Sequence, residues 1–152
     1  MSLRERIDAE IKVAMKSKDK VRLETVRSIK KFILEKEVSV RPSGQETLTE
    51  AQEMEILMQI AKQRRDSIEQ YRKAGREELA AQEAAELAIV EEYLPQQMSD
   101  EEIDKAIAEI IASVGATSPK DLGKVMGPAM QQLKGKADGK KIQEAVKAKL
   151  NG

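Results

Sequence analysis

The chain has 152 residues, 36% of them charged, and its 27 Lys and Arg residues balance its 27 Asp and Glu residues. It contains neither cysteine nor histidine, which excludes disulfides, thiolate nucleophiles and zinc sites built on those ligands. Good helix formers dominate a composition with one phenylalanine and no tryptophan, so we predict an all-α fold with an aliphatic core, no metal and no cofactor.

The first 33 residues predict a helical hairpin. Two apolar stripes recur at helical spacing, and Ser17-Lys18-Asp19 interrupts them. The first stripe consists of Leu3, Ile7, Ile11 and Met15, and the second of Leu23, Val26, Ile29 and Ile33. The two helices are therefore expected to run in opposite directions.

Two further helices are predicted before residue 95. Residues 40–44 are typical of a loop, and Thr47-Leu48-Thr49-Glu50 indicates a capping box for a long helix that ends near Gly75. Another helix covers about residues 76–92, and Pro95 stops it because a residue before proline avoids helical backbone. We place a domain boundary there, between an N-terminal four-helix region, residues 1–94, and a C-terminal unit, residues 95–152.

Three helices are predicted in the C-terminal unit. Ser99 and Glu102 form a capping box for a helix that ends at Gly115, and Ser118-Pro119 starts the next one. Pro128 falls inside that second helix, so we expect a kink there or two shorter pieces. Asp138 is expected to cap the third.

Charge is unevenly distributed along the chain. Residues 1–41 carry 12 Lys and Arg against 7 Asp and Glu, residues 42–119 carry 7 against 17, and residues 120–152 carry 8 against 3. Such a pattern is expected of a protein whose ends meet a polyanion, or of basic segments that pack against an acidic one. Charge alone slightly favours the second explanation.

The basic C-terminal segment interleaves lysines with glycines. A glycine backbone N–H and a neighbouring ammonium group can approach the same anion, and the start of the last helix adds positive potential. We predict that this segment binds nucleic-acid phosphates; its residues are Lys124, Lys134, Gly135, Lys136, Gly139, Lys140 and Lys141. The alternative is that the lysines only keep a small domain soluble.

A secondary basic patch is predicted on the long helix, at Lys62, Arg64, Arg65 and Arg72. Asp66 and Glu69 lie among these residues and neutralise part of their field. We therefore expect the patch to be mainly an ion-pair network within the hairpin. The only aromatic residues, Phe32, Tyr71 and Tyr93, fall in apolar stripes, so RNA contacts should involve backbone and shape and not base stacking.

Five motifs, in order along nearly the whole chain, resemble those of the GatB/YqeY family. They are Met15–Lys20, Lys62–Tyr71, Ala74–Arg76, Glu91–Gln97, and Gly123–Gly127 with Lys134–Lys140. The resemblance implies an all-helical, two-part fold like the tail of the B subunit of the glutamine-dependent amidotransferase. That carbon–nitrogen ligase uses glutamine as the amide donor on misacylated Glu-tRNA or Asp-tRNA, and its tail helps to hold the tRNA.

The resemblance and the basic segment together favour a non-catalytic accessory module, without catalytic residues of its own. The expected partner is tRNA or a tRNA-bearing amidotransferase or synthetase complex. One alternative is an adaptor for an acidic protein partner. Another is an amidotransferase activity of the chain itself, although it has no Gly-x-x-x-x-Gly-Lys-Ser/Thr loop for ATP. Without a signal peptide or an apolar run of roughly 20 residues, we expect no membrane partner and a cytoplasmic location.

Overall fold

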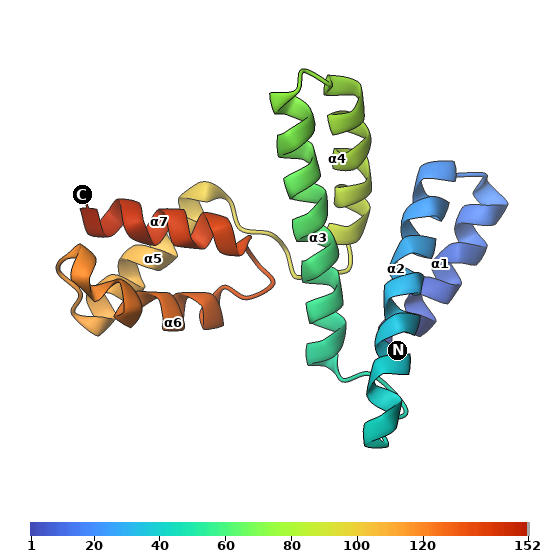
Figure 1. The fold of residues 1–152 in the computed structure, drawn as a ribbon, viewed down its shortest axis with the longest axis horizontal. Helices are drawn as coiled ribbons and strands as arrows, with labels where there is room; N and C mark the ends of the chain where they lie inside the picture. The colour runs from blue at the N-terminus through green and yellow to red at the C-terminus, as the bar shows by residue number, and fades with distance from the viewer. Residues whose placement is uncertain (152) are drawn as a thin grey trace. The chain divides into compact units, whose positions relative to one another are not determined.

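The computed structural model describes residues 1–151, which form seven α-helices and no strand (Figure 1). They belong to two compact units, Met1–Leu94 and a unit that starts at Pro95. The first contains α1 (Leu3–Ser17), α2 (Lys20–Val40), α3 (Glu50–Lys73) and α4 (Glu77–Glu91). The second contains α5 (Asp100–Val114), α6 (Leu122–Gln132) and α7 (Gly139–Asn151). The predicted all-α class and the arrangement of four helices followed by three are confirmed.

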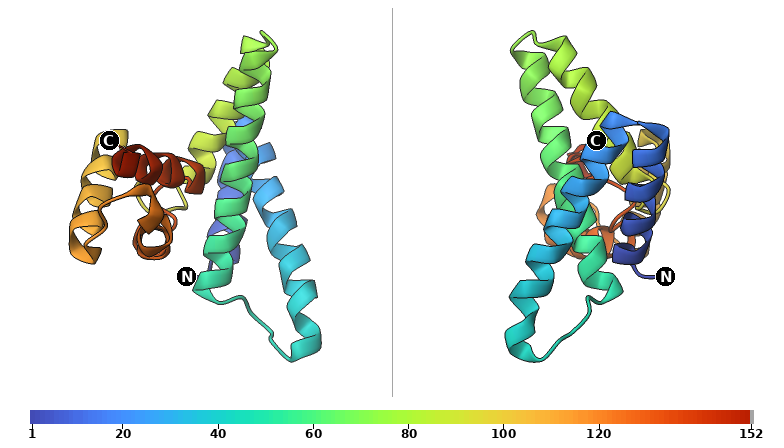
Figure 2. Two further views of the ribbon diagram at one scale, coloured as in Figure 1. Left: turned by 60° about the vertical axis from the view of Figure 1, so that its left-hand side comes forward. Right: turned by 90° about the vertical axis from the view of Figure 1, so that its right-hand side faces the viewer.

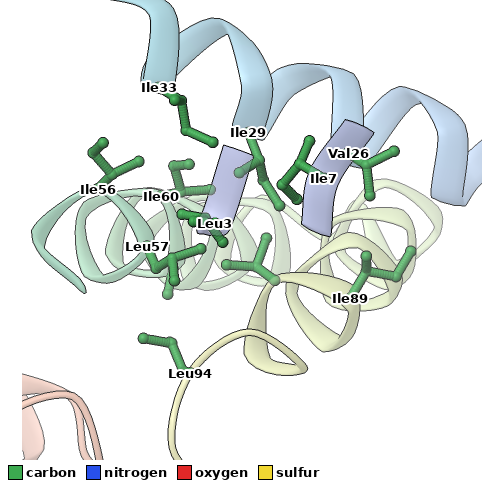
Figure 3. Packing of buried hydrophobic residues seen from close by; sticks show 12 residues of the cluster. Leu3, Ile7, Val26, Ile29, Ile33, Ile56, Leu57, Ile60, Ile89 and Leu94 are labelled. Carbon is green, nitrogen blue, oxygen red and sulfur yellow. The ribbon is translucent and has the colours of Figure 1, made fainter. Parts of the chain in front are cut away.

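The N-terminal unit consists of two antiparallel hairpins, α1–α2 and α3–α4 (Figures 1 and 2). Helix α2 contacts α1, α3 and α4, so its buried face is central to the core. Figure 3 shows Val26, Ile29 and Ile33 of α2 among side chains from the other helices. All three are at most 1% exposed.

The buried face of α1 differs from the predicted stripe. Leu3 and Ile7 are buried, but Ile11 is only partly buried, Met15 is 54% exposed, and Ala14 is fully buried. A spacing of four residues advances the side chain by about 400°, so the stripe drifts by about 40° at each step. Ala14, seven residues after Ile7, returns to the core face in place of Met15.

Side chains cap several helices, and one predicted capping box is shifted. The hydroxyl of Thr49 accepts from the Gln52 N–H, and the Gln52 side chain accepts from the Thr49 N–H. The box therefore starts at Thr49 and not at Thr47. The predicted start was wrong because the Thr-x-x-Glu/Gln pattern occurs twice in this segment. The predicted box between Ser99 and Glu102 at the start of α5 is present.

The C-terminal unit has its own aliphatic core. Buried side chains from all three helices form it: Ile103, Ile107, Ile110, Val125, Ala129, Ile142, Val146 and Leu150, with Leu133 and Ala137 between α6 and α7. None of the helices within residues 1–151 is long and apolar enough to cross a membrane.

Helix α6 differs from its predicted form at two points. It starts at Leu122, after a 3-10 turn over Pro119–Asp121, and Ser118 makes no side-chain cap. The helix continues through Pro128, so the alternative of two separate pieces is wrong. Proline removes one backbone hydrogen bond and its ring crowds the carbonyl four residues earlier, but the buried Val125 and Ala129 hold the helix on either side. The expected kink stays a prediction.

The central position of α2 predicts a large effect of truncating its buried face. Ile29→Ala should lower the free energy of unfolding by about 2–5 kcal/mol, because it removes buried methyl groups and leaves a cavity. Val38→Ala, on the same helix but at a side chain 57% exposed, should change it by less than about 0.5 kcal/mol. Urea unfolding followed by circular dichroism measures both; equal effects would contradict the assignment of the core face.

Candidate functional site

The loop between α6 and α7 is anchored through its backbone. Gly135 is buried, with φ of 79°, and its carbonyl accepts from Nε2 of Gln97 at 2.8 Å. The carbonyl of Lys136 accepts from the N–H of Met98, also at 2.8 Å. These bonds fix the loop from the first residues of the unit and leave the side chains of Lys134 and Lys136 exposed.

The start of α7 adds further cations beside this loop. The side chain of Asp138 accepts from the Lys140 N–H at 3.5 Å, and its carbonyl accepts from the Ile142 N–H at 3.0 Å, as expected of a cap. Lys140 and Lys141 follow in the first turn, which contains no acidic residue. Cations are disfavoured at this end of a helix, so their presence is not explained by helix stability.

Some of the five predicted lysines form ion pairs with nearby carboxylates, and others do not. Lys141 lies 3.0 Å from a carboxylate oxygen of Asp100, and Lys124 lies 3.6 Å from one of Asp121. Lys134 and Lys136 have no ion pair within residues 1–151. Of these predicted lysines, Lys134 and Lys136 in the loop are therefore the ones whose charge no carboxylate of the described residues pairs.

The surface around Lys141 is acidic. A hollow of about 210 Å³ between α5 and α7 is lined by Asp100, Asp104 and Glu144 together with Lys141. Three carboxylates against one ammonium group repel phosphate. An anion is better placed at Lys134 and Lys136, whose ammonium groups are not neutralised.

The secondary basic patch is an ion-pair network. Each of its four members lies within 4.0 Å of a carboxylate oxygen: Lys62 of Asp66, Arg64 of Glu83 and Glu86, Arg65 of Glu91, and Arg72 of Glu77. The three arginines pair with carboxylates of α4. The patch thus joins α3 to α4, and its charge is largely compensated.

Arg64 is the most buried cation of this network. Its side chain is 17% exposed, and that of its partner Glu86 is 12% exposed. Burial raises the pKa of Glu86 above its usual value, although the nearby Arg64 guanidinium acts in the opposite direction. Arg64 therefore offsets part of the cost of a carboxylate buried between helices.

The structure also shows a cationic surface at which no site was predicted. Lys12, Lys16, Lys18 and Lys20 are all exposed near the connection of α1 to α2. None of them forms an ion pair within the described part of the chain. The excess of Lys and Arg in residues 1–41 was the signal that could have identified this surface.

Comparisons with known proteins identify relatives along most of the chain. The sequence model of the YqeY-like protein family matches residues 4–150. A protein of Pyrenophora tritici-repentis named "Altered inheritance of mitochondria protein 41, mitochondrial" is 31% identical over 95% of this chain and 81% of its own length. A protein of the same name from Kluyveromyces lactis is 31% identical over 91% of this chain and 71% of its own length.

These names contradict the expected location. The relatives are named as mitochondrial proteins, which points to mitochondria and not to the cytoplasm. The expectation rested on two absences, that of a signal peptide and that of an apolar run long enough to span a membrane. Neither absence distinguishes the cytoplasm from mitochondria.

The ion-pair network predicts that Arg64 and Lys62 differ sharply in their contribution to stability. Arg64→Ala leaves Glu86 buried without its partner and should lower the free energy of unfolding by about 2 kcal/mol. Lys62→Ala removes only an exposed pair and should change it by less than about 0.5 kcal/mol. Thermal or urea unfolding of both variants compares them directly, and an equally small effect at Arg64 would contradict its structural role.

The raised pKa of Glu86 predicts a pH dependence of stability. Because the folded state binds this proton more tightly than the unfolded state, the contribution of Glu86 to stability falls as pH rises above 4.5, the usual pKa of a glutamate. Glu86→Gln keeps an oxygen for Arg64 but cannot ionise, so the free energy of unfolding of the parent should fall relative to the variant over this range. Urea unfolding at several pH values measures the difference. Glu55→Gln, at an exposed position, is the control.

Proposed function

The chain belongs to the YqeY-like protein family, and we propose that it is a non-catalytic accessory module that binds tRNA, or a tRNA-bearing amidotransferase complex, through the loop before α7. The observation that carries this proposal is the pair of exposed, unpaired lysines on either side of the buried Gly135. We further propose that the protein acts in mitochondria, since its relatives are named as mitochondrial proteins.

Backbone anchoring makes the loop suited to this role. Gln97 and Met98 hold the carbonyls of Gly135 and Lys136, so the loop backbone is ordered before a ligand arrives. Ordering in advance lowers the conformational entropy lost on binding. Lys134 and Lys136 then lose mainly side-chain freedom when they contact phosphates.

The mode of recognition follows from the side chains that are present. The C-terminal unit contains no aromatic residue, so it has no platform on which bases could stack. Lysine provides a point charge without the bidentate geometry that arginine uses for bases and phosphates. Contacts of this kind respond to the position of phosphates and hence to the shape of a folded RNA.

The proposal predicts a change in the salt dependence of tRNA binding. Replacing both Lys134 and Lys136 by alanine should make the slope of log K against log salt shallower by about 1.8, since each phosphate contact contributes roughly 0.9. Affinity at 0.1 M salt should fall by about 60-fold, which is about eightfold for each of the two contacts. Fluorescence anisotropy with a labelled tRNA transcript, over a roughly sixfold range of salt from about 50 to about 300 mM, measures the affinity and its salt slope.

The matched control is Lys62→Ala, which removes an exposed lysine that is paired with Asp66. It should bind tRNA with the affinity and salt slope of the parent. If the double variant also behaves like the parent, the loop before α7 is not the binding site.

A further inference from the structure

The connection between α1 and α2 concentrates cations that the folded chain does not neutralise. Lys12 and Lys16 lie one turn apart near the end of α1, Lys18 lies in the connection, and Lys20 is the first residue of α2. All four side chains are exposed and have no ion pair within the described residues. Asp19, the one acidic residue among them, caps α2 by accepting from the Arg22 N–H and lies 3.8 Å from the Arg22 side chain.

Lys18 occupies a backbone conformation that favours glycine. Its φ of 59° and ψ of 32° are left-handed, and no other non-glycine residue in the described chain has a positive φ. Gly115 occupies the equivalent position at the end of α5, and Gly75 has a positive φ just after the end of α3. A lysine at this position strains the backbone relative to glycine, and its charge, which is favourable at the C-terminal end of α1, offsets only part of that strain.

Lys20 is also poorly placed for helix stability. It is the first residue of α2, where the Asp19 carboxylate at the N-cap complements the helix dipole and no acidic residue follows in the first turn. A cation at this end of a helix is unfavourable, and Lys20 has no carboxylate partner that would compensate. Two neighbouring lysines thus occupy positions where folding favours other residues, which points to a role in binding.

The cationic surface continues along the outer face of α2. Lys20, Arg27 and Lys31 are spaced by seven and four residues, so they lie within about 20° of one line along the helix, separated by about 10 and 6 Å. All three are exposed, on the side opposite the buried Ile29. A row of cations at whole turns of a helix suits a linear array of negative charges.

The exposed aliphatic residues near the end of α1 do not form a membrane-binding face. Val13 and Met15 are 55% and 54% exposed. They are two positions apart on the helix, which corresponds to about 200° around its axis, so they point to opposite sides. Lys12 and Lys16 lie between them on the outward side of α1. An interfacial helix instead gathers its apolar residues on one face.

We propose that Lys12, Lys16, Lys18 and Lys20 form a second phosphate-binding surface, which contacts the sugar–phosphate backbone of a folded RNA. This inference rests on the proposed function for the nature of the ligand, but it uses a different part of the chain. The surface belongs to the N-terminal unit and needs no contact with the loop before α7.

Three substitutions in the full chain test this inference, with labelled tRNA as the probe. Lys18→Ala and Lys20→Ala should each weaken binding about eightfold at 0.1 M salt and make the salt slope shallower by about 0.9. Lys18→Gly should weaken binding as much as Lys18→Ala, yet raise the midpoint of thermal unfolding by a few degrees because glycine relieves the left-handed strain. A residue with a merely structural role would not show higher stability together with weaker binding.

Lys105→Ala, at an exposed and unpaired lysine of α5, is the control and should bind tRNA like the parent. If Lys18→Ala and Lys20→Ala also bind like the parent while the Lys134 and Lys136 double variant is weaker, the inference is wrong and the proposed function stands. If only the α1–α2 variants are weaker, the inference stands and the loop before α7 is not the site. Failure of the parent to bind tRNA overturns both.

A membrane arm separates RNA from lipid phosphates. Sedimentation with vesicles of neutral phosphatidylcholine, alone or mixed with an anionic phospholipid, should show no binding that depends on Lys18 or Lys20. If these substitutions abolish binding to anionic vesicles and leave tRNA binding unchanged, the surface contacts lipid and the RNA assignment is overturned.

Discussion

The N-terminal unit depends on the packing of one helix. Helix α2 contacts each of the other three, and the apolar side chains that it buries, Val26, Ile29 and Ile33, are β-branched and have few rotamers to lose. Because the buried face of α2 is fixed by its neighbours, its opposite face must remain outside the core of this unit. The cations at Lys20, Arg27 and Lys31 lie on that outer face. The same packing that forms the core therefore determines which charges remain accessible.

The distribution of ion pairs separates structural cations from candidate binding residues better than composition does. Arg64, the most buried basic residue of α3, lies between two carboxylates of α4, and its partner Glu86 is buried as well. The lysines before α7 and at the α1–α2 connection occur in the two segments of the chain that carry an excess of basic residues. Most of these lysines have no carboxylate partner of the kind that Arg64 has. The carboxylates within these two connections, Asp19 and Asp138, accept hydrogen bonds from backbone N–H groups at the starts of α2 and α7.

Much of the fold could be predicted because helix signals are local. The cap of α5 by Ser99 and Glu102 and the end of that helix at Gly115 depend on residues within a few positions of one another. The prediction was wrong where a pattern fitted two registers, as at Thr47 and Thr49, or where a four-residue repeat drifted around the helix, as at Met15. The first case needed a choice between two equivalent local patterns, and the second needed the angular drift of the repeat to be followed along the helix.

The candidate site was predictable only in part. The lysines and glycines before α7 form a pattern in sequence, whereas the pairing of Lys141 with Asp100 joins residues 41 positions apart. The left-handed backbone of Lys18 is a property of the folded hairpin, and it distinguishes this lysine from the many others in the chain. A sequence rich in lysine shows where charge is abundant, but only the fold shows where it is costly to stability.

The position of the aromatic residues has a consequence for spectroscopy. Phe32, Tyr71 and Tyr93 all belong to the N-terminal unit, and the C-terminal unit contains none. The Arg6 guanidinium carbon lies 4.9 Å from the centroid of the Tyr93 ring. Burial raises the pKa of the Tyr93 phenol to about 12. Tyrosine absorbance and fluorescence therefore report on one unit alone, while far-ultraviolet circular dichroism reports on the helices of both. The chain carries a natural optical label that distinguishes unfolding of its first unit from unfolding of its second, without the introduction of a probe.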